Sequence, residues 1–261
     1  NNVARRRNFL GRISDHIIAL KMKLLALALF ASSAAAFTST GSNVLSKTAL
    51  NSAKAELEEV AAKANPVLKF WDPMDFLTLE FDGFSNEETI NFIRHAEIKH
   101  CRVAMAAFVG YIVQSTGFHF PFPIDLAGDS YPTMLSPPEQ WDALPFMGKV
   151  QIISLVGFLE LFSEGAGTHY MKGGRPGEFP NFSDHPEWIP HPVPLNLFDP
   201  FGFSKSASAE TKATGLVKEL NNGRLAMVGI LGFLSEQKLE GSVPLLKGIV
   251  APYAGEPMAP F

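Results

Sequence analysis

Apolar positions gather in three long segments of the chain, at about residues 85–117, 141–165 and 209–237. Ser85 or Asn86 can cap the first segment, acidic residues follow in its first turn, and Gly117 ends it, so this segment is predicted to be a helix. The second segment is apolar over most of residues 150–162, and the third changes from polar to apolar along its length. The pattern therefore predicts three long helices.

None of the three helices contains twenty consecutive apolar residues, but each combines an apolar stretch with a polar end. We expect each to cross a membrane and to extend beyond it. Lys and Arg are absent from Val103 to Gly148, whereas they occur in the loop between the second and third helices and in the arm before the first. The positive-inside tendency puts the N-terminus and that second loop on one side of the membrane. The predicted fold is an all-α membrane protein with three transmembrane helices.

Two stretches repeat one pattern: EIKHCRVAM (Glu97–Met105) and ELNNGRLAM (Glu219–Met227). An aromatic-Asp-Pro turn precedes each copy, WDPM (Trp71–Met74) before the first and FDPF (Phe198–Phe201) before the second. The first and third helices are therefore related, and the middle helix belongs to neither copy.

The repeat predicts a pair of reciprocal ion pairs. Glu97 and Arg102 are five positions apart, roughly 140° around a helix, so they cannot pair within their own helix. An unpaired charge near hydrocarbon costs several kcal/mol. If helices one and three cross with pseudo-two-fold symmetry, Glu97 meets Arg224 and Glu219 meets Arg102. Small residues allow the close approach: Ala104, Ala106, Ala107, Gly110, Gly223, Ala226, Gly229 and Gly232.

Composition supports a membrane protein, since apolar residues make up 46% of the 261 residues and charged residues only 18%. The stretch MKLLALALFASSAAAF from Met22 has the anatomy of a signal peptide. Without residues 1–36, 16 Lys and Arg face 25 Asp and Glu, a net charge of −9. So acidic a chain is not expected to bind nucleic acid. The single cysteine, Cys101, is expected to be a small apolar filler.

After the ion pairs form, His100 and Asn222 remain as outward-facing donors, together with carboxylates already neutralised by Arg. Such single donors suit the axial position of a metal whose charge a macrocycle cancels. A bare dication would draw several carboxylates and waters instead. The ligands are scattered, which favours several separate cofactors.

Over about residues 65–250 the chain resembles the light-harvesting chlorophyll-binding family, through EIKHCRVAM, ELNNGRLAM and FDPFGF. HYMKGG, GSVP and the SAAAF presequence junction resemble its fucoxanthin–chlorophyll a/c branch in red-lineage algae. The resemblance implies that chlorophyll a, chlorophyll c and fucoxanthin or related carotenoids bind. It also implies a plastid thylakoid membrane with a stromal N-terminus, and as partners a photosystem I or II core, other antenna subunits and thylakoid lipids.

The resemblance implies one chlorophyll magnesium at each of seven residues: Glu97, His100, Gln151, Glu160, Glu219, Asn222 and Glu236. Gln237, next to Glu236, is an alternative ligand at that end of helix three. The two Asp-Pro turns, Trp71, Asp72, Pro73 and Phe198, Asp199, Pro200, would hold carotenoid ends. Each of these residues also has a purely structural alternative. The Glu–Arg sets would then be structural ion pairs only, and His100 or Asn222 would be ordinary helix residues. Gln151, Glu160 and Glu236 would be polar residues near a helix end or the membrane interface.

Four regions are expected: upstream residues and a presequence at 1–36, a stromal arm at 37–84, a three-helix chlorophyll-binding domain at 85–238 and a lumenal tail at 239–261. Within the arm, AKAELEEVAAKA is expected to form an exposed polar helix.

The predicted function is light harvesting, with excitation passed to a photosystem and no bond chemistry. No phosphate-binding loop or catalytic triad pattern argues for an enzyme. A photoprotective relative that dissipates excitation remains an alternative, because the same ligands would serve it. A small membrane transporter is an alternative from another class, although ion pairs that hold helices together are poor ion relays.

Overall fold

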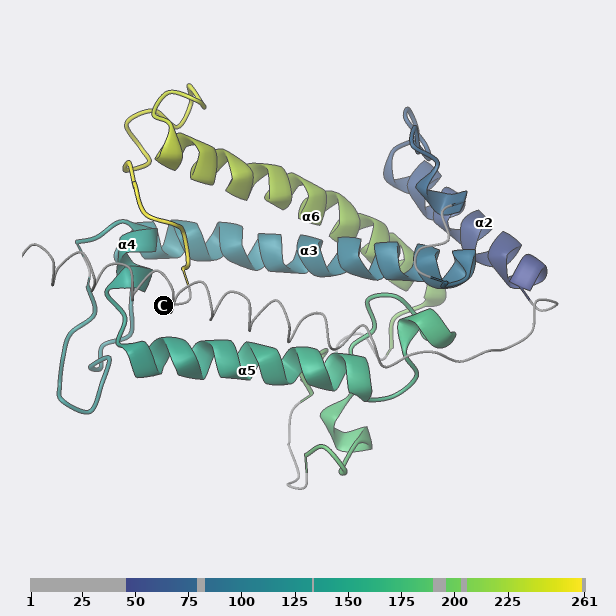
Figure 1. The fold of residues 1–261 in the computed structure, drawn as a ribbon, viewed down its shortest axis with the longest axis horizontal. Helices are drawn as coiled ribbons and strands as arrows, with labels where there is room; N and C mark the ends of the chain where they lie inside the picture. The colour runs from purple at the N-terminus through teal and green to yellow at the C-terminus, as the bar shows by residue number, and fades with distance from the viewer. Residues whose placement is uncertain (1–45, 79–82, 133, 190–195, 203–205, 260–261) are drawn as a thin grey trace, which may run out of the picture. The chain divides into compact units, whose positions relative to one another are not determined.

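A computed structural model describes residues 46–78, 83–132, 134–189, 196–202 and 206–259. These residues form helices and turns with no strand. The presequence and its expected cleavage point lie outside the described residues. The main helices are α2 (Ser46–Ala64), α3 (Asn86–Ser115), α5 (Phe146–Gly165) and α6 (Ala209–Lys238), with a short α4 (Pro137–Asp142) before α5 (Figure 1).

Helices α3 and α6 are each 30 residues long and cross in close contact (Figure 1). Ser85 caps α3 as the sequence predicts: its hydroxyl accepts from the Glu88 backbone N–H, and its own N–H donates to the Glu88 carboxylate. Ser208 caps α6 by accepting from the Thr211 N–H. Capping satisfies N–H groups that the first helical turn leaves unpaired.

The crossing depends on small residues, but not on all of those expected. Cys101 is fully buried, and a side chain on Gly223 would overlap its Cβ. Cys101 is therefore the apolar filler that the sequence predicts. Gly229 lies against the ring of Phe108. Gly110, in contrast, has no neighbour within 4 Å of where a Cβ would lie, so its predicted place at the crossing is wrong.

The second predicted helix begins later than its sequence suggests. The segment from 141 onward was expected to be continuous, but α4 ends at Asp142 and Pro145 is the N-cap of α5. A proline fixes its own backbone angle and disfavours helix in the residue before it, so the chain restarts at Phe146. By length and composition alone, Phe146–Lys172 is the one candidate membrane span among the described helices, so hydropathy by itself does not identify α3 and α6 as spans.

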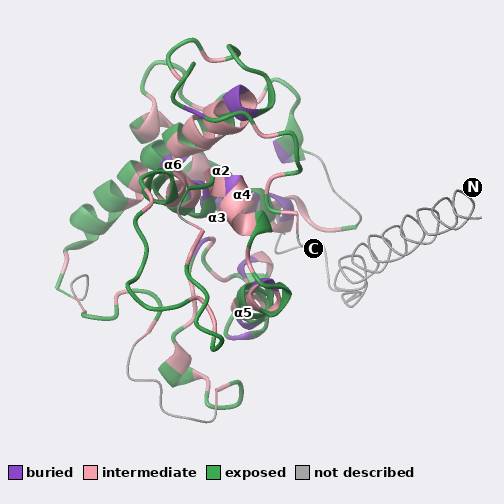
Figure 2. Cartoon of the chain, turned by 90° about the vertical axis from the view of Figure 1, so that its left-hand side faces the viewer, coloured by how far each residue is buried: buried purple, intermediate pink, exposed green. Residues whose placement is uncertain are grey.

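Very few of the described residues cover the middle of helix α5. Residues 151–158 are all exposed, on every side of the helix, and they include Ile152, Leu155 and Phe158. Figure 2 likewise shows much of the surface of α6 as exposed or only partly buried. Apolar side chains exposed on such a scale require a non-aqueous neighbour.

The helix in the arm is packed, not free. Helix α2 lies against both α3 and α6, and Ala53, Leu77 and Ile90 form a buried cluster there. An ion pair joins Arg94 Nη2 to Glu56 Oε1 at 3.1 Å. The expectation of an exposed polar helix is thus wrong for one face of α2, because Ala53 is buried in this cluster and Leu57 packs against it.

The residues after α6 fold back toward α4. Trp141 Nε1 donates to the Ala259 carbonyl at 2.8 Å, and the Tyr253 hydroxyl donates to Asp142 Oδ2 at 2.5 Å. The hydrogen bond to the Asp142 carboxylate raises the pKa of Tyr253 to about 12. The C-terminal segment is therefore attached to the loop between α3 and α5.

Candidate functional site

Both ion pairs expected from the repeat are present between α3 and α6. Arg224 Nη2 lies 2.7 Å from Glu97 Oε1, and Arg102 Nε lies 2.6 Å from Glu219 Oε1. In each pair the guanidinium contacts the same carboxylate oxygen, Oε1. The second oxygen, Oε2, makes no hydrogen bond to any residue that the structure describes. The arginine thus offsets the charge of each glutamate, and Oε2 is left as a candidate metal ligand.

The two pairs have different surroundings despite their matching sequences. Helix α2 lies beside the Glu97–Arg224 pair, and together they line a small pocket with Leu57, Val60 and Leu216. On the other side, Arg102 Nη1 donates to the Gly177 carbonyl at 2.6 Å. Gly177 has φ +81° and no room for a Cβ beside Ile98, so glycine is required there.

A hydrogen bond selects the tautomer of His100. Its Nδ1 lies 2.7 Å from the Ala96 carbonyl oxygen, and a carbonyl can only accept, so Nδ1 carries the proton. The neutral ring then has a lone pair on Nε2. Because the His100 side chain is exposed, that lone pair is accessible to a ligand from outside the helix pair.

Asn222 and Gln151 also have exposed side chains, whose amide oxygens are candidate metal ligands. Neither makes a hydrogen bond to another described residue. Asn222 follows Glu219 by three positions, so the two lie on one face of α6. The neighbouring Asn221 behaves differently, since its Nδ2 donates to the Ala64 carbonyl at the end of α2 at 3.1 Å.

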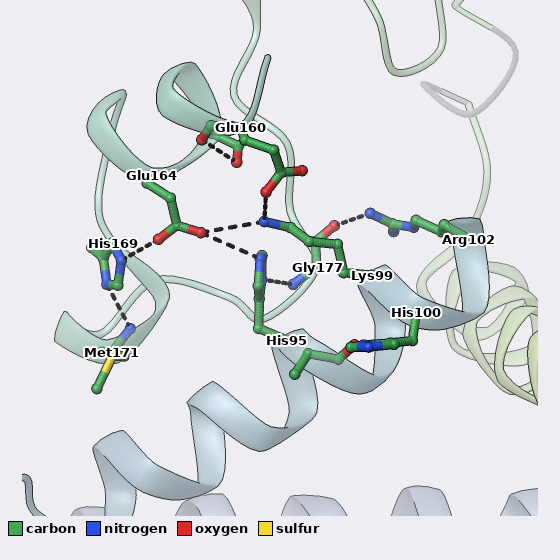
Figure 3. Close-up of polar contacts among 11 residues, drawn as sticks. His95, Lys99, His100, Arg102, Glu160, Glu164, His169, Met171 and Gly177 are labelled. Atoms are coloured by element: carbon green, nitrogen blue, oxygen red, sulfur yellow. Dashed lines mark hydrogen bonds and ion pairs between the residues drawn. The ribbon is translucent and has the colours of Figure 1, made fainter. Parts of the chain in front are cut away.

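Glu160 has a cationic partner that sequence reasoning missed. Lys99 Nζ, from α3, lies 2.5 Å from Glu160 Oε2 and 3.3 Å from Glu164 Oε1 (Figure 3). The spacing of Lys99 and Glu160, 61 positions apart, gives no sign of the contact. Only the position of α5 relative to α3 reveals it.

Around Glu164, two histidines and a tyrosine complete a network that the sequence did not indicate. His169 Nε2 donates to Glu164 Oε2 at 2.7 Å. His95 stacks on Tyr170 with ring centroids 3.9 Å apart. Figure 3 shows that His95 Nδ1 also accepts a hydrogen bond from the Gly177 N–H. These contacts attach the turn after α5 to α3.

The structure gives Glu236 a structural role. Its side chain is only 1% exposed, and its two oxygens accept hydrogen bonds from the backbone N–H groups of Gly241 and Val243. Glu236 therefore stabilises the turn after α6, which argues against the expected ligand role. The adjacent Gln237 is 2% exposed, and neither polar atom of its side chain has a hydrogen-bond partner among the described residues.

The two Asp-Pro turns expose their aromatic residues. Asp72 folds the first turn, because its carboxylate oxygens accept from the Phe76 and Leu77 N–H groups at 3.1 Å. In the second turn Asp199 has φ +50°, and its carbonyl accepts from the Gly202 N–H. Trp71, Pro73, Phe198 and Pro200 are all exposed. Each turn thus presents apolar rings on a folded loop.

These features define a helical protein whose outer helix surfaces carry separate candidate metal ligands. Each ligand atom is an oxygen or a nitrogen, and each group is neutral or has its charge offset by an arginine or a lysine. Residues 53–238 match the family model of chlorophyll A-B binding proteins. The chain belongs to this family.

Several relatives are similar over most of their length. A fucoxanthin-chlorophyll a-c binding protein of Trieres chinensis is 38% identical over 86% of this chain and 98% of its own. Fucoxanthin-chlorophyll a-c binding protein F of Phaeodactylum tricornutum is 32% identical over 84% of this chain and 96% of its own. Fucoxanthin-chlorophyll a-c binding protein A of Macrocystis pyrifera is 31% identical over 74% of this chain and 77% of its own.

Proposed function

We propose that this chain is a light-harvesting antenna protein that binds chlorophyll a, chlorophyll c and fucoxanthin and passes excitation to a photosystem. The relatives' names describe these pigments, and the chain spans nearly the full length of the first two. Bound pigments absorb the light, and the protein sets their positions. No bond is made or broken, so the protein is not an enzyme.

The observation that carries this function is the charge-compensated carboxylate. A chlorophyll already balances the charge of its magnesium, so a bare carboxylate ligand would add a net negative charge in an apolar environment, where isolated charges are costly. Arg224 beside Glu97 and Arg102 beside Glu219 cancel that charge while leaving Oε2 free. The donor set therefore fits chlorophyll.

Six residues are proposed to hold chlorophyll magnesium. Each is at least partly exposed and keeps a donor atom free of hydrogen bonds to the described residues: Glu97, His100, Gln151, Glu160, Glu219 and Asn222. We leave Glu236 out because its oxygens are occupied by backbone N–H groups. The exposed rings of Trp71 and Phe198 support a carotenoid-end role for the turns at Trp71, Asp72, Pro73 and Phe198, Asp199, Pro200.

The proposed setting is a plastid thylakoid membrane crossed by α3, α5 and α6, with the N-terminus in the stroma. The absence of Lys and Arg from 103 to 148 supports this orientation. The proposed regions are a presequence at 1–36, a stromal arm at 37–84, the pigment domain at 85–238 and a lumenal tail at 239–261. A photosystem I or II core and other antenna subunits are the proposed partners.

Refolding tests the function directly. The full chain is refolded in detergent with chlorophyll a, chlorophyll c and fucoxanthin, then purified, and its pigments are quantified. We expect stable pigment binding, with chlorophyll a emission after excitation of fucoxanthin. Pigmented micelles without protein are the control for chance transfer. A colourless purified protein would refute the proposal, and bound pigment with strongly quenched emission would favour a dissipative role.

A further inference from the structure

Helix α5 cannot neutralise its own acidic residues. It carries Glu160 and Glu164 one turn apart on one face, and the chain has no Lys or Arg from Val150 to Met171. The repeat that supplies arginines to the α3–α6 crossing does not include α5. A cation for these carboxylates must therefore come from another element, and Lys99 of α3 is the residue that reaches them (Figure 3).

The two carboxylates are not equivalent. Glu164 has both oxygens occupied, Oε1 by Lys99 at 3.3 Å and Oε2 by His169 at 2.7 Å, and its side chain is 38% exposed. Glu160 contacts Lys99 through Oε2 alone, and its side chain is 52% exposed. Its Oε1 makes no hydrogen bond to a described residue. Glu164 thus attaches the end of α5, whereas Glu160 keeps an open donor atom.

We propose that Lys99 is the positioning residue for the chlorophyll at Glu160. Lys99, on α3, places a cation on the Glu160 carboxylate of α5. Arg224 does the same for Glu97, and Arg102 does the same for Glu219. The inference rests on the proposed function and extends it to a third charge-compensated ligand, built outside the repeat. Lys99 lies nearer to Glu160, at 2.5 Å, than to Glu164, at 3.3 Å, so Glu160, like the two repeat glutamates, has a cation in direct contact.

Lysine suits this position better than arginine would. An ammonium is a compact charge with three donors on a flexible stem, so it can contact two carboxylates that point differently. Lys99 does so, with its Nζ between Glu160 and Glu164 (Figure 3). The arginines of the crossing contact one carboxylate each.

The test compares pigment stoichiometry of refolded full-length variants. Lys99→Met keeps most of the stem and removes the charge, and we expect it to lose about one chlorophyll, because Glu160 without its cation would bring an uncompensated charge to the pigment. Adding Glu160→Gln should restore that chlorophyll, because an amide oxygen is a neutral ligand that needs no cation. Adding Glu160→Leu instead should keep the fold and leave the chlorophyll missing.

Glu164→Gln in the Lys99→Met background is the matched control. A lysine that only holds α5 through Glu164 would be rescued by this change and not by Glu160→Gln, which would overturn the proposal. Full pigment content in Lys99→Met would overturn it as well. Wild-type protein that binds pigment normally separates these outcomes from a failure of the antenna function itself.

Discussion

At His100 a single hydrogen bond decides which ring nitrogen a ligand can use. The Ala96 carbonyl takes the Nδ1 proton, so Nε2 is the available atom. The same distinction separates the other candidates. Glu97, Glu219 and Glu160 each have one oxygen without a hydrogen bond to a described residue, whereas both oxygens of Glu236 accept hydrogen bonds. A residue type therefore makes a ligand possible, and the contacts of its individual atoms decide whether it is available.

Asn221 and Asn222 offer a matched test at this scale. Replacing Asn222 with leucine should remove about one chlorophyll, because the amide is exposed and makes no hydrogen bond to a described residue. Replacing Asn221 should leave the pigments in place, since its amide donates to α2 instead. Pigment analysis of both refolded variants checks the prediction. Equal pigment content in the two variants would remove Asn222 from the ligand set.

Among the helices, the crossing of α3 and α6 sets the geometry of the site. The close approach at Cys101 and Gly223 brings the two helix backbones near enough for each arginine to reach the opposite glutamate. Small residues permit such approaches between membrane helices. The ion pairs and the packing are therefore mutually dependent.

Gly223→Ala should weaken the crossing, because the added methyl would overlap Cys101, and overpacking of this kind typically costs about 1–3 kcal/mol. Gly215→Ala on the same helix is the control. No atom lies within 4 Å of its Cβ position, so this change should stabilise the helix by up to about 1 kcal/mol. Thermal unfolding of the pigment-loaded variants, followed by visible circular dichroism, measures both. A Gly223→Ala midpoint at or above that of wild type would show that the helices can separate without loss.

Across the whole molecule, α5 is attached mainly near its ends. The Lys99 and Glu164 contacts hold one end, and α4 with the C-terminal segment lies at the other. Between them its apolar side chains are exposed. In the proposed thylakoid setting, pigments and lipids would fill that space and cover this apolar surface.

The attachment of the C-terminal segment makes a prediction about pH. The hydrogen bond to Asp142 raises the pKa of Tyr253 to about 12, above the ordinary value of about 10. A raised pKa favours the protonated phenol in the folded state, so this contact stabilises the fold fully below about pH 10 and is lost as the pH rises through about 12. Ultraviolet titration should therefore show a phenol that ionises near pH 12.

Two variants identify that phenol. Tyr253→Phe should remove its share of the absorbance change, and Asp142→Asn should move its ionisation back toward the ordinary range, because the carboxylate is the main cause of the shift. Titration curves that match the wild type in both variants would contradict the contact.

Much of this organisation could be predicted from sequence. The repeat at Glu97 and Glu219 identified two helices and the residues that pair them, because matching sequences in a crossed pair must give reciprocal contacts. Cap residues such as Ser85 marked where helices begin, since capping is a local interaction. The break at Pro145 and the packed face of α2 were missed. Apolar residues lie on both sides of Pro145 and hide the break in the helix, and the contacts of α2 depend on helices distant in sequence.

The sequence by itself determined which elements form and which donor residues they carry, since helix periodicity, caps and a repeated motif are all local patterns. Tertiary structure alone decided which donors stay open. Three contacts show this: Lys99 pairs with Glu160, the turn after α6 donates hydrogen bonds to Glu236, and α2 packs beside Glu97. Local sequence patterns do not determine how far apart in space these segments lie. Charge compensation is such a contact, and under the proposed function it determines which carboxylates hold a pigment.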